Sequence, residues 1–466
     1  MDIGALFAGV SNGIESGGRL VEFWSRTSKI YLGFKLVQVE NILLHRDADA
    51  RDTRWASHHE WAAKKMYSLC VDMRGFFLKA GQFLGGRDDF FPEAYCMLLS
   101  TLQDRVPPMS AEKTRRAIEK ELGGRSLEEV FSNLSLGDPL GSGTIAQVHS
   151  ANLVSNSSQV AVKIQYPNAE KQMLADLTRL RILAKFLQKT ELKFDILSAV
   201  NELSKEIGRE FNFSNEAQSL NTVATNLQRR GANRRVEIPR PIDEVSTRRM
   251  LVMTFVNGTP MTQLKVKIRN VSERRRNLVS RKLLEAITDA YGGMILVDGM
   301  FQADPHPGNV MVKKDLSIGI VDFGQCKKLE KLDQTRLAKL VFKIHKGDSA
   351  GMISALHELG VKTKRIREIE SQPSPEHLGR SGRPQILPEE KLARTMFDTR
   401  SIEGVSNSPF SNDSAIKHVE VETFPQQLYF VLRTVQILRG VAHGMGVSDF
   451  SVCDRWNKVY RNQLRQ

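Results

Sequence analysis

Two polar motifs near the middle of the sequence constrain the fold most, because each is attached to a short apolar run. The segment DPHPGN extends from Asp304 to Asn309 and is followed at once by the apolar residues Val310–Val312. The tripeptide DFG begins at Asp322, thirteen residues after Asn309, and is preceded by the apolar run Ile318–Val321. Short apolar runs rich in β-branched residues predict strands. We therefore expect two strands that carry carboxylate and amide side chains at their ends.

These residue types suit phosphoryl transfer. That reaction needs metal ligands that hold magnesium on the phosphates of a nucleotide, and a carboxylate that orients the nucleophile. Asn309 and Asp322 are the candidate metal ligands, and Asp304 is the candidate catalytic carboxylate. A DFG tripeptide alone arises readily by chance, so the interpretation depends on the motifs that precede it.

A glycine-rich segment lies far upstream. Residues 141–148 read GSGTIAQV and match the pattern GxGxxGxV except at the third glycine. Glycine lets a backbone approach phosphate oxygens closely, although a tight hairpin turn is the alternative. The strand VAVK then ends at Lys163, which would reach the α and β phosphates unless it is an ordinary surface lysine. The candidate nucleotide-binding residues are Gly141, Ser142, Gly143, Thr144, Ala146, Val148 and Lys163.

The sequence also resembles one family. Residues 79–82 (KAGQ), 145–149 (IAQVH), 160–163 (VAVK) and 303–309 (ADPHPGN), together with DFG, are similar to the UbiB-like atypical kinases, also called aarF-domain-containing kinases. KxGQ and ADPHPGN are specific to that family, whereas VAVK and DFG are shared by the wider kinase fold. The resemblance covers roughly residues 65–345 and the final helices.

The resemblance implies a two-lobed, protein-kinase-like α+β fold with a helical N-terminal extension and C-terminal helices. It implies that Lys163 binds the nucleotide phosphates and pairs with Glu216. Asp304 would occupy the catalytic position, and Asn309 and Asp322 would hold Mg²⁺.

The resemblance also implies a regulatory extension. Lys79 and Gln82 would belong to a helical segment that folds over the nucleotide site and restricts protein substrates. Glu210 would be the first residue of the ExD motif that this extension contacts. The third position of that motif is Asn212, so it brings no charge.

Two other departures from the family concern the nucleotide. The usual alanine-rich loop is here GSG, which makes the backbone more accessible to phosphates and puts the family's usual damping of nucleotide use in doubt. Thr254 stands in the hinge-like segment where relatives often have glutamate.

Two absences weigh against a protein kinase. Gln302 and Ala303 replace the His-Arg pair of the catalytic loop, and no Ala-Pro-Glu follows DFG. Instead, Leu329–Phe342 predicts a helix almost at once, which leaves no platform for docking a peptide.

The sequence predicts five segments. We expect helices over Asp195–Leu220 and Asn277–Val297, and a long loop over 367–418 that is rich in Ser, Pro, Arg and Gly. The predicted segments are a helical extension with KxGQ (1–110), a kinase-like N-lobe (111–258), a C-lobe (259–366), an insertion (367–421) and C-terminal helices (422–466).

The net charge of +14 is concentrated rather than spread. Residues 226–282 contain 15 Lys and Arg but only 4 Asp and Glu. We interpret this segment as a basic surface that faces an anionic membrane or partner, or else as an ordinary solvated surface. No aromatic residues are interleaved among the arginines of 269–276, so nucleic acid is not expected as a partner.

The function expected from these observations is an ATP- and Mg²⁺-dependent atypical kinase or ATPase. By resemblance it would support isoprenoid-quinone or other lipid metabolism, with lipid-biosynthesis proteins as partners, peripherally at a mitochondrial or plastid membrane. No clear transit peptide or run of some 18 apolar residues is visible. The alternatives are a protein kinase acting on Ser or Thr, and a nucleotide-binding scaffold without turnover.

Overall fold

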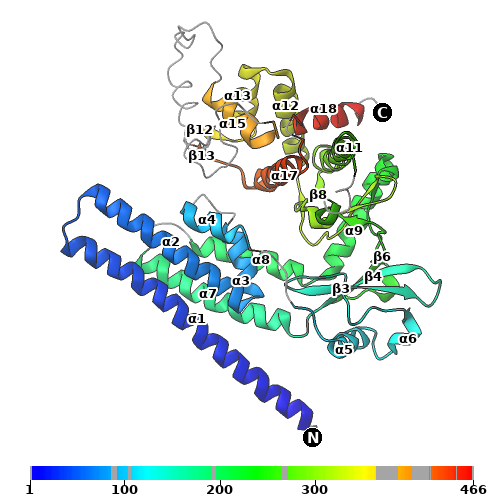
Figure 1. The fold of residues 1–466 in the computed structure, drawn as a ribbon, viewed down its shortest axis with the longest axis horizontal. Coiled ribbons are helices and arrows are strands. Elements are labelled where there is room, and N and C mark those ends of the chain that lie inside the picture. The colour runs from blue at the N-terminus through cyan, green and yellow to red at the C-terminus, as the bar shows by residue number, and fades with distance from the viewer. Residues whose placement is uncertain are drawn as a thin grey trace. The chain divides into compact units, whose positions relative to one another are not determined.

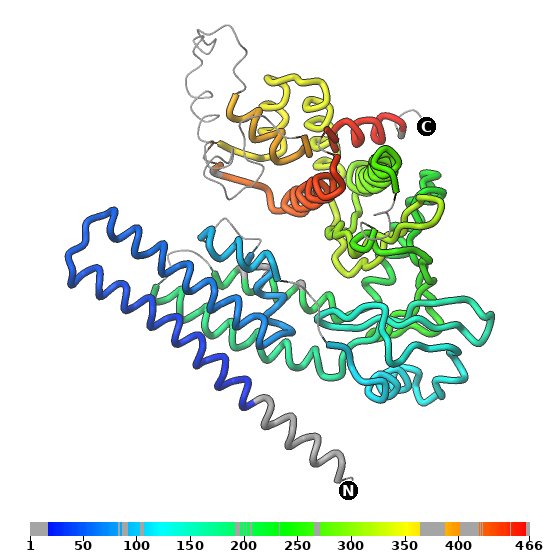
Figure 2. The backbone as a smooth tube through the Cα atoms, viewed as in Figure 1, coloured from blue at the N-terminus to red at the C-terminus, as the bar shows by residue number. Residues whose placement is uncertain are grey.

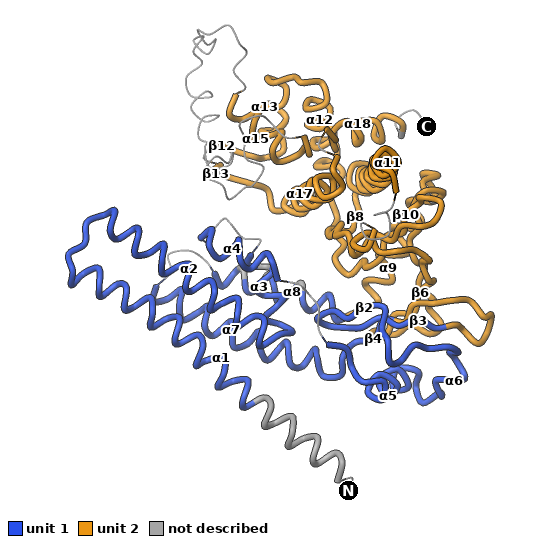
Figure 3. Tube along the Cα trace, in the orientation of Figure 1, with its two compact units in different colours: residues 1–151, 163–211 blue, residues 152–162, 212–466 orange. Residues whose placement is uncertain are grey.

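The computed structural model describes residues 3–85, 92–102, 107–191, 196–264, 271–363, 387–400, 419, 421–447 and 449–463. The chain divides into two compact units (Figure 3). Unit 1 comprises residues 1–151 and 163–211, and unit 2 comprises residues 152–162 and 212–466. Both helices and strands are present, as the predicted α+β class requires.

Unit 1 is mostly helical, and its four strands follow the first six helices (Figure 1). The described part of the N-terminal region predicted to be helical (1–110) holds four helices, separated by short non-helical stretches. The elements are α1 (Ile3–Leu43), α2 (Ala48–Met73), α3 (Phe76–Gly85), α4 (Glu93–Leu99), α5 (Ala111–Glu121), α6 (Leu127–Val130), β1 (Phe131–Ser132), β2 (Gly141–Ser142), β3 (Ala146–Leu153), β4 (Gln159–Gln165), α7 (Ala169–Thr190) and α8 (Ile196–Glu210).

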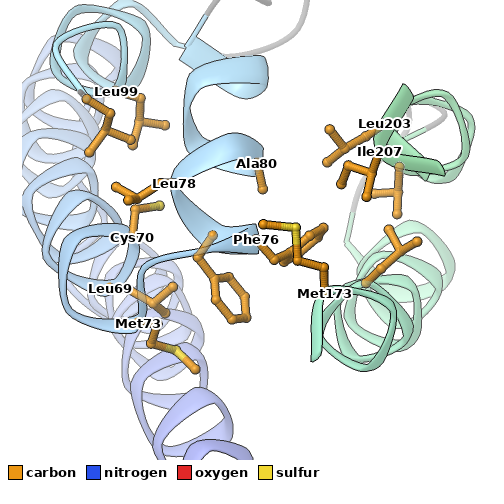
Figure 4. Packing of buried hydrophobic residues seen from close by; sticks show 14 of the residues in the cluster. Leu69, Cys70, Met73, Phe76, Leu78, Ala80, Leu99, Met173, Leu203 and Ile207 are labelled. Carbon is orange, nitrogen blue, oxygen red and sulfur yellow. The ribbon is translucent and has the colours of Figure 1, made fainter. Parts of the chain in front are cut away.

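The short helix α3 lies inside the hydrophobic core of unit 1 (Figure 4). Its side chain Leu78 points toward Cys70 of α2 and Leu99 of α4, whereas Phe76 points toward Met173 of α7. Phe76 is fully buried. Burying a phenylalanine or leucine side chain stabilises a fold by about 1.5–3 kcal/mol. This helix carries the KxGQ motif, so the motif is built on a packed element.

A buried ion pair joins α1 to α7 within unit 1. The carboxylate of Asp176 has no exposed surface, and Arg19 donates to it from Nε at 3.0 Å and from Nη2 at 2.7 Å. Arg179 also pairs with this carboxylate. Two guanidinium groups therefore compensate one buried charge, as a carboxylate removed from water requires.

The main sheet has the strand order β1-β3-β4-β6, and β2 pairs with β3. The predicted strand Val160–Ile164 lies in β4, where Val160 and Val162 are fully buried. The division into units falls within β3 and β4, so that their connecting turn belongs to unit 2.

Unit 2 holds the remaining strands and the C-terminal helices, whose path can be followed in Figure 2. β9 pairs with β10 and β7, β10 also pairs with β5, β11 pairs with β8, and β12 pairs with β13. The elements are α9 (Phe213–Arg229), β5 (Val236–Glu237), β6 (Met250–Thr254), β7 (Thr259–Pro260), α11 (Glu273–Gly292), β8 (Met300–Gln302), β9 (Val310–Val312), β10 (Ile318–Ile320), β11 (Cys326–Lys328), α12 (Lys331–Lys346), α13 (Ser349–Glu358), β12 (Lys362–Thr363), α15 (Pro388–Phe397), β13 (Val421–Thr423), α17 (Gln426–Gly444) and α18 (Val452–Gln463).

The prediction of a single helix over Asp195–Leu220 is wrong, because the helix is interrupted between α8, which ends at Glu210, and α9, which begins at Phe213. Asn212 has extended backbone angles, and its side chain accepts a hydrogen bond from Ser214 N at 3.1 Å. It is therefore the N-cap of α9. The preceding Phe211 is fully buried, and its carbonyl oxygen accepts a hydrogen bond from Gln165.

The long loop predicted over 367–418 is also wrong in part, because Pro388–Phe397 forms the helix α15. Proline at the first turn and two glutamates after it are favourable at a helix N-terminus. Leu392 and Phe397 are fully buried, so an apolar face drives this helix into the core. The remainder of the predicted loop, apart from 387 and 398–400, lies outside the described residues.

The predicted helix Asn277–Val297 is confirmed, although it ends in a π-helical segment, Gly293–Asp298. Here Arg230 donates from Nε to both oxygens of Asp298 at 3.1 Å, and both side chains are almost completely buried. Burial raises the pKa of Asp298, and the neighbouring guanidinium opposes that shift. Arg230 belongs to the basic segment 226–282, so that segment is not entirely a surface.

Candidate functional site

The hairpin of β9 and β10 positions the two candidate metal ligands. Val310 is paired with Ile320 in the antiparallel register, and Val321 N donates to the Asn309 carbonyl oxygen at 2.9 Å. Asn309 directly precedes β9, and Asp322 follows β10 by two residues. The register therefore brings their side chains to the same end of the hairpin. A carboxylate and an amide are oxygen ligands that suit Mg²⁺.

The backbone at Asp322 is held in a conformation that aspartate seldom adopts. Its φ is +64°, in the left-handed region. The carboxylate Oδ1 accepts a hydrogen bond from Gly324 N at 3.3 Å. Non-glycine residues in this region cost about 1–3 kcal/mol and cluster at functional sites. The conformation directs the chain out of the strand at the DFG motif.

Glu216 is held against the same motif from α9. It is buried, and its Oε1 accepts a hydrogen bond from Phe323 N at 3.2 Å. A Cβ added at Gly324 would lie 3.4 Å from Asp322 Oδ1 and 3.6 Å from Glu216 Oε2. The two carboxylates thus both border the backbone of Gly324.

The catalytic loop is anchored by Gln302, which the sequence interpretation treated only as a replacement for histidine. Its Nε2 donates to the carbonyl oxygens of Asp304 at 2.7 Å and Asp322 at 3.2 Å. Its Oε1 accepts from Asp304 N at 3.1 Å and from the Tyr291 hydroxyl. One buried amide therefore joins the catalytic loop to DFG.

Tyr291 is the second residue that the sequence interpretation missed. It is fully buried on α11, and burial, with the charge of Asp304 as a lesser cause, raises the pKa of its phenol well above the ordinary value. The phenol therefore stays protonated and donates to Gln302. An apolar helix gave no sequence signal for this contact.

Asp304 is half-buried and is reached from two sides. Asn309 Nδ2 donates to its carbonyl oxygen at 3.2 Å, which leaves the amide oxygen of Asn309 as the group that can accept or ligate. Arg433 of α17 donates to its carboxylate Oδ1 at 3.3 Å. His306 in the same loop accepts from Gly308 N at 3.1 Å and caps the short turn Pro307–Asn309.

In unit 1, the glycine-rich segment forms a tight hairpin, and its contact with phosphate stays a prediction. Gly141 is paired with Val148 and Ser142 with Gln147, and Gly143 N donates to the Ala146 carbonyl oxygen at 2.9 Å. Neither Gly141 nor Gly143 has a positive φ, and a Cβ at either position would meet no clash. The hairpin itself therefore does not require glycine there. Thr144 and Ala146 are buried rather than accessible.

The KxGQ motif lies on α3 of the same unit and does contact Glu210. Lys79 Nζ lies 3.0 Å from Glu210 Oε2, and both side chains are largely buried. Gln82 Nε2 donates to the Leu102 carbonyl oxygen at 3.2 Å. Gly81 is closely packed, because a Cβ there would lie 2.5 Å from a methyl carbon of Leu102 and would force that side chain to shift.

The predicted site residues thus fall into two groups. Unit 2 brings together the residues of the catalytic loop, DFG and α9, and unit 1 holds the glycine-rich hairpin, Lys163 and the KxGQ pair. Lys163 is half-buried in β4. Its predicted pairing with Glu216 would join residues of different units, and it stays a prediction.

Thr254, the residue of the hinge-like segment where relatives often have glutamate, ends β6. Its Oγ1 accepts a hydrogen bond from Arg240 N at 2.9 Å.

Comparison with known proteins identifies similar sequences. The profile described as the ABC1 atypical kinase-like domain matches residues 101–356. AarF domain-containing protein kinase 1 of Gallus gallus is 29% identical over 410 residues, which are 82% of this chain and 71% of that protein. The Mus musculus protein of the same name is 33% identical over 258 residues, which are 55% of this chain and 46% of that protein.

Plant and bacterial proteins are similar too. The chloroplastic ACTIVITY OF BC1 COMPLEX KINASE 7 of Arabidopsis thaliana is 28% identical over 370 residues, 79% of this chain and 50% of that protein. A solved Mycobacterium tuberculosis protein in complex with erythromycin aligns with a TM-score of 0.52 and 21% identity, over 86% of this chain and 100% of that chain. The profile match and this likeness in fold confirm the predicted kinase-like α+β fold.

Gln302→Ala tests the anchoring of the catalytic loop. We expect the substitution to lower the free energy of unfolding by about 2–4 kcal/mol, because it removes a buried amide and leaves the Tyr291 hydroxyl without its partner. Denaturant unfolding measures this loss. Gln436→Ala, at an exposed position of α17, serves as the control and should cost less than about 0.5 kcal/mol. Equal effects of the two substitutions would contradict the anchoring role.

Proposed function

The chain belongs to the ABC1 atypical kinase-like family, and on that premise we propose that it is a kinase-type enzyme that binds ATP with Mg²⁺ and transfers or hydrolyses the γ-phosphate. The observation that carries this proposal is the β9–β10 hairpin, which brings Asn309 and Asp322 to one end. Asp304 is joined to Asp322 through Gln302 and to Asn309 by a direct hydrogen bond. Their oxygen atoms fit a magnesium ion, which neutralises phosphate charge when it is bound.

The proposal does not require that protein side chains supply all the ligands of the metal ion. Among the residues that the structure describes, no group of three or more His, Cys, Asp or Glu side chains could hold a metal ion. Magnesium in nucleotide sites characteristically takes one or two protein ligands and fills its shell with phosphate oxygens and water. Asn309 and Asp322 provide that number.

The proposed reaction transfers the γ-phosphoryl group of ATP to an acceptor oxygen. The oxygen of an acceptor hydroxyl, or of water, forms a bond to the γ-phosphorus, and the bond from that phosphorus to the bridging oxygen of ADP breaks. Asp304 accepts a hydrogen bond from the attacking O–H and takes its proton. Lys163 would bind the α and β phosphates, as the family resemblance implies.

Two observations on unit 2 favour a small or lipid-linked acceptor over a protein. Only Gln325–Glu330 lie between DFG and the start of α12 at Lys331. Within that stretch, β11 is paired with β8. No room remains there for the platform on which protein kinases dock a peptide. The intact Asp304, Asn309 and Asp322 weigh against a scaffold without turnover.

Asp322→Asn tests the proposed role of the carboxylate. We expect the full chain to bind ATP more tightly with Mg²⁺ than without it, and Asp322→Asn to abolish most of this difference. Phosphate release should fall by about 10²–10³-fold, the usual effect of removing an electrostatic group from such a site. Titration calorimetry and phosphate release measure the two effects.

Asp315→Asn is the control, because Asp315 is an exposed turn residue of the same hairpin. It should leave both quantities unchanged. A wild-type chain that binds no nucleotide would remove the proposed function. Full turnover by Asp322→Asn would show that the metal role is assigned to the wrong residue.

We also propose that the extension restrains the enzyme, as the resemblance implies. The contact that supports this proposal is the ion pair of Lys79 with Glu210, which lies just before the N-cap of α9. Breaking it would free the ExD segment and loosen α3, although packing holds that helix from both sides.

Lys79→Ala should therefore increase autophosphorylation several-fold. Phosphate incorporation from labelled ATP measures it. Lys35→Ala is the matched control, because Lys35 forms an ion pair with Glu191 at 2.7 Å elsewhere in unit 1. Equal autophosphorylation of the wild type and Lys79→Ala would contradict the inhibitory role proposed for the extension.

We further propose that the protein acts in isoprenoid-quinone or other lipid metabolism at an organellar membrane. The support is the family resemblance, the chloroplastic names of plant relatives and the exposed arginines Arg274 and Arg275 at the start of α11. Among the described residues, no helix has the length and apolar character needed to cross a bilayer. Each basic residue near an anionic membrane contributes about 1 kcal/mol to binding.

The double charge reversal Arg274→Glu and Arg275→Glu should weaken binding to anionic liposomes by at least tenfold. Binding of the wild type should fall as the salt concentration rises, because exposed charges are screened. Liposome co-sedimentation measures both. Arg116→Glu, an exposed position in unit 1, is the control. Binding that ignores lipid charge and salt would refute the proposed membrane surface.

A further inference from the structure

Arg433 contacts the carboxylate at the centre of the proposed reaction. Its Nη2 donates to Asp304 Oδ1 at 3.3 Å, from a helix that lies 129 residues further along the chain. The pair is accessible, since 30% of the Asp304 side chain and 42% of the Arg433 side chain are exposed. In the part of the chain that the structure describes, this is the single hydrogen bond of a guanidinium that has five N–H donors.

The helix that carries Arg433 is firmly placed within unit 2. Leu428, Val431, Val435 and Leu438 of α17 are buried. One turn before Arg433, the ring of Phe430 lies 3.9 Å from Lys327 Nζ, in the strand that follows DFG. The same side of α17 therefore contacts both the DFG strand and the catalytic loop, and Arg433 is aimed at Asp304 by packed neighbours.

Stability does not account for this contact. An exposed ion pair contributes only about 0–1 kcal/mol, because water and salt screen it. A guanidinium whose other donors are accessible is, however, suited to binding phosphate, with which it forms paired hydrogen bonds. Sites of phosphoryl transfer use arginine or lysine to compensate the charge on the transferred group.

The reach of the guanidinium fits such a contact. Under the proposed function, the attacking oxygen lies about 2.6–3.2 Å from Asp304. The γ-phosphorus then lies about 3–3.5 Å beyond that oxygen. A planar group that is already bonded to the Asp304 carboxylate can therefore present its outer N–H groups to the oxygens of the γ-phosphoryl group.

We propose that Arg433 is a phosphate-contacting residue, which holds the Asp304 carboxylate with one N–H group and binds the γ-phosphoryl oxygens with the others. This inference rests on the proposed function and adds to it the source of positive charge at the transferred group. ADP has no γ-phosphate, so Arg433 should distinguish the triphosphate from the diphosphate.

The experiment compares the full-length wild type with Arg433→Ala and Arg433→Lys, in the presence of Mg²⁺. Calorimetric titration with ADP and with the β,γ-imido analogue of ATP gives the two affinities. Arg433→Ala should bind ADP within twofold of wild type but the analogue at least tenfold more weakly. Phosphate release should fall about 100-fold in Arg433→Ala. It should fall less in Arg433→Lys, which keeps a positive charge but not the planar fork.

Two controls separate a phosphate contact from a structural role. Arg281→Ala removes a guanidinium of similar exposure that pairs with Asp449 at 3.2 Å, and it should leave both affinities unchanged. Added guanidinium ion at millimolar concentration should restore part of the phosphate release of Arg433→Ala, because it can fill the space left by the side chain.

The outcomes are distinguishable. If the wild type binds neither nucleotide, the proposed function itself fails. If the wild type binds and turns over ATP but Arg433→Ala keeps the full preference for the triphosphate analogue, the role of Arg433 is overturned and the proposed function stands. Equal losses of ADP and analogue affinity would likewise overturn it, as would faster turnover, which would make the contact an inhibitory one.

Discussion

The arrangement of the candidate site depends on the register of one hairpin. Pairing of β9 with β10, extended by the hydrogen bond from Val321 to Asn309, places an amide and a carboxylate at one end. A shift of one residue would turn every side chain of a strand to the opposite face. The buried residues Val310 and Ile320 oppose such a shift, because it would expose them. Apolar burial therefore determines where the polar groups lie.

The second constraint is that the catalytic loop before β9 and the DFG segment after β10 are bonded to one side chain. Gln302 bonds to the backbone of both, and its amide is itself held by the buried phenol of Tyr291. Gln302 donates to the backbone carbonyl oxygens of Asp304 and Asp322. The contact therefore does not depend on the side chains at these two positions. The carboxylates of Asp304 and Asp322 are not used in these contacts with Gln302. A site that handles charge is thus supported by a neutral, buried amide.

Sequence reasoning found the parts of the site that are contiguous and missed those that depend on packing. Strand, turn and DFG are local, and each has a recognisable pattern. Tyr291 and Arg433 lie on helices whose sequences look ordinary, and only the tertiary fold brings them to the catalytic loop. The break before α9 was missed because the apolar pattern continues through it, whereas the capping by Asn212 acts on the backbone. The helix α15 was missed since a composition rich in proline and serine on both sides concealed its apolar face.

The glycines of the chain differ in how much space surrounds them. Gly81 and Gly293 are favoured by packing, since a Cβ would collide with the side chain of Leu102 or with the guanidinium of Arg230. Gly141 and Gly143 face no such neighbour and have ordinary backbone angles. The fold alone would accept alanine at both positions. The proposed contact of this hairpin with phosphate would supply a reason for glycine that packing does not, because bare backbone N–H groups can bind phosphate oxygens.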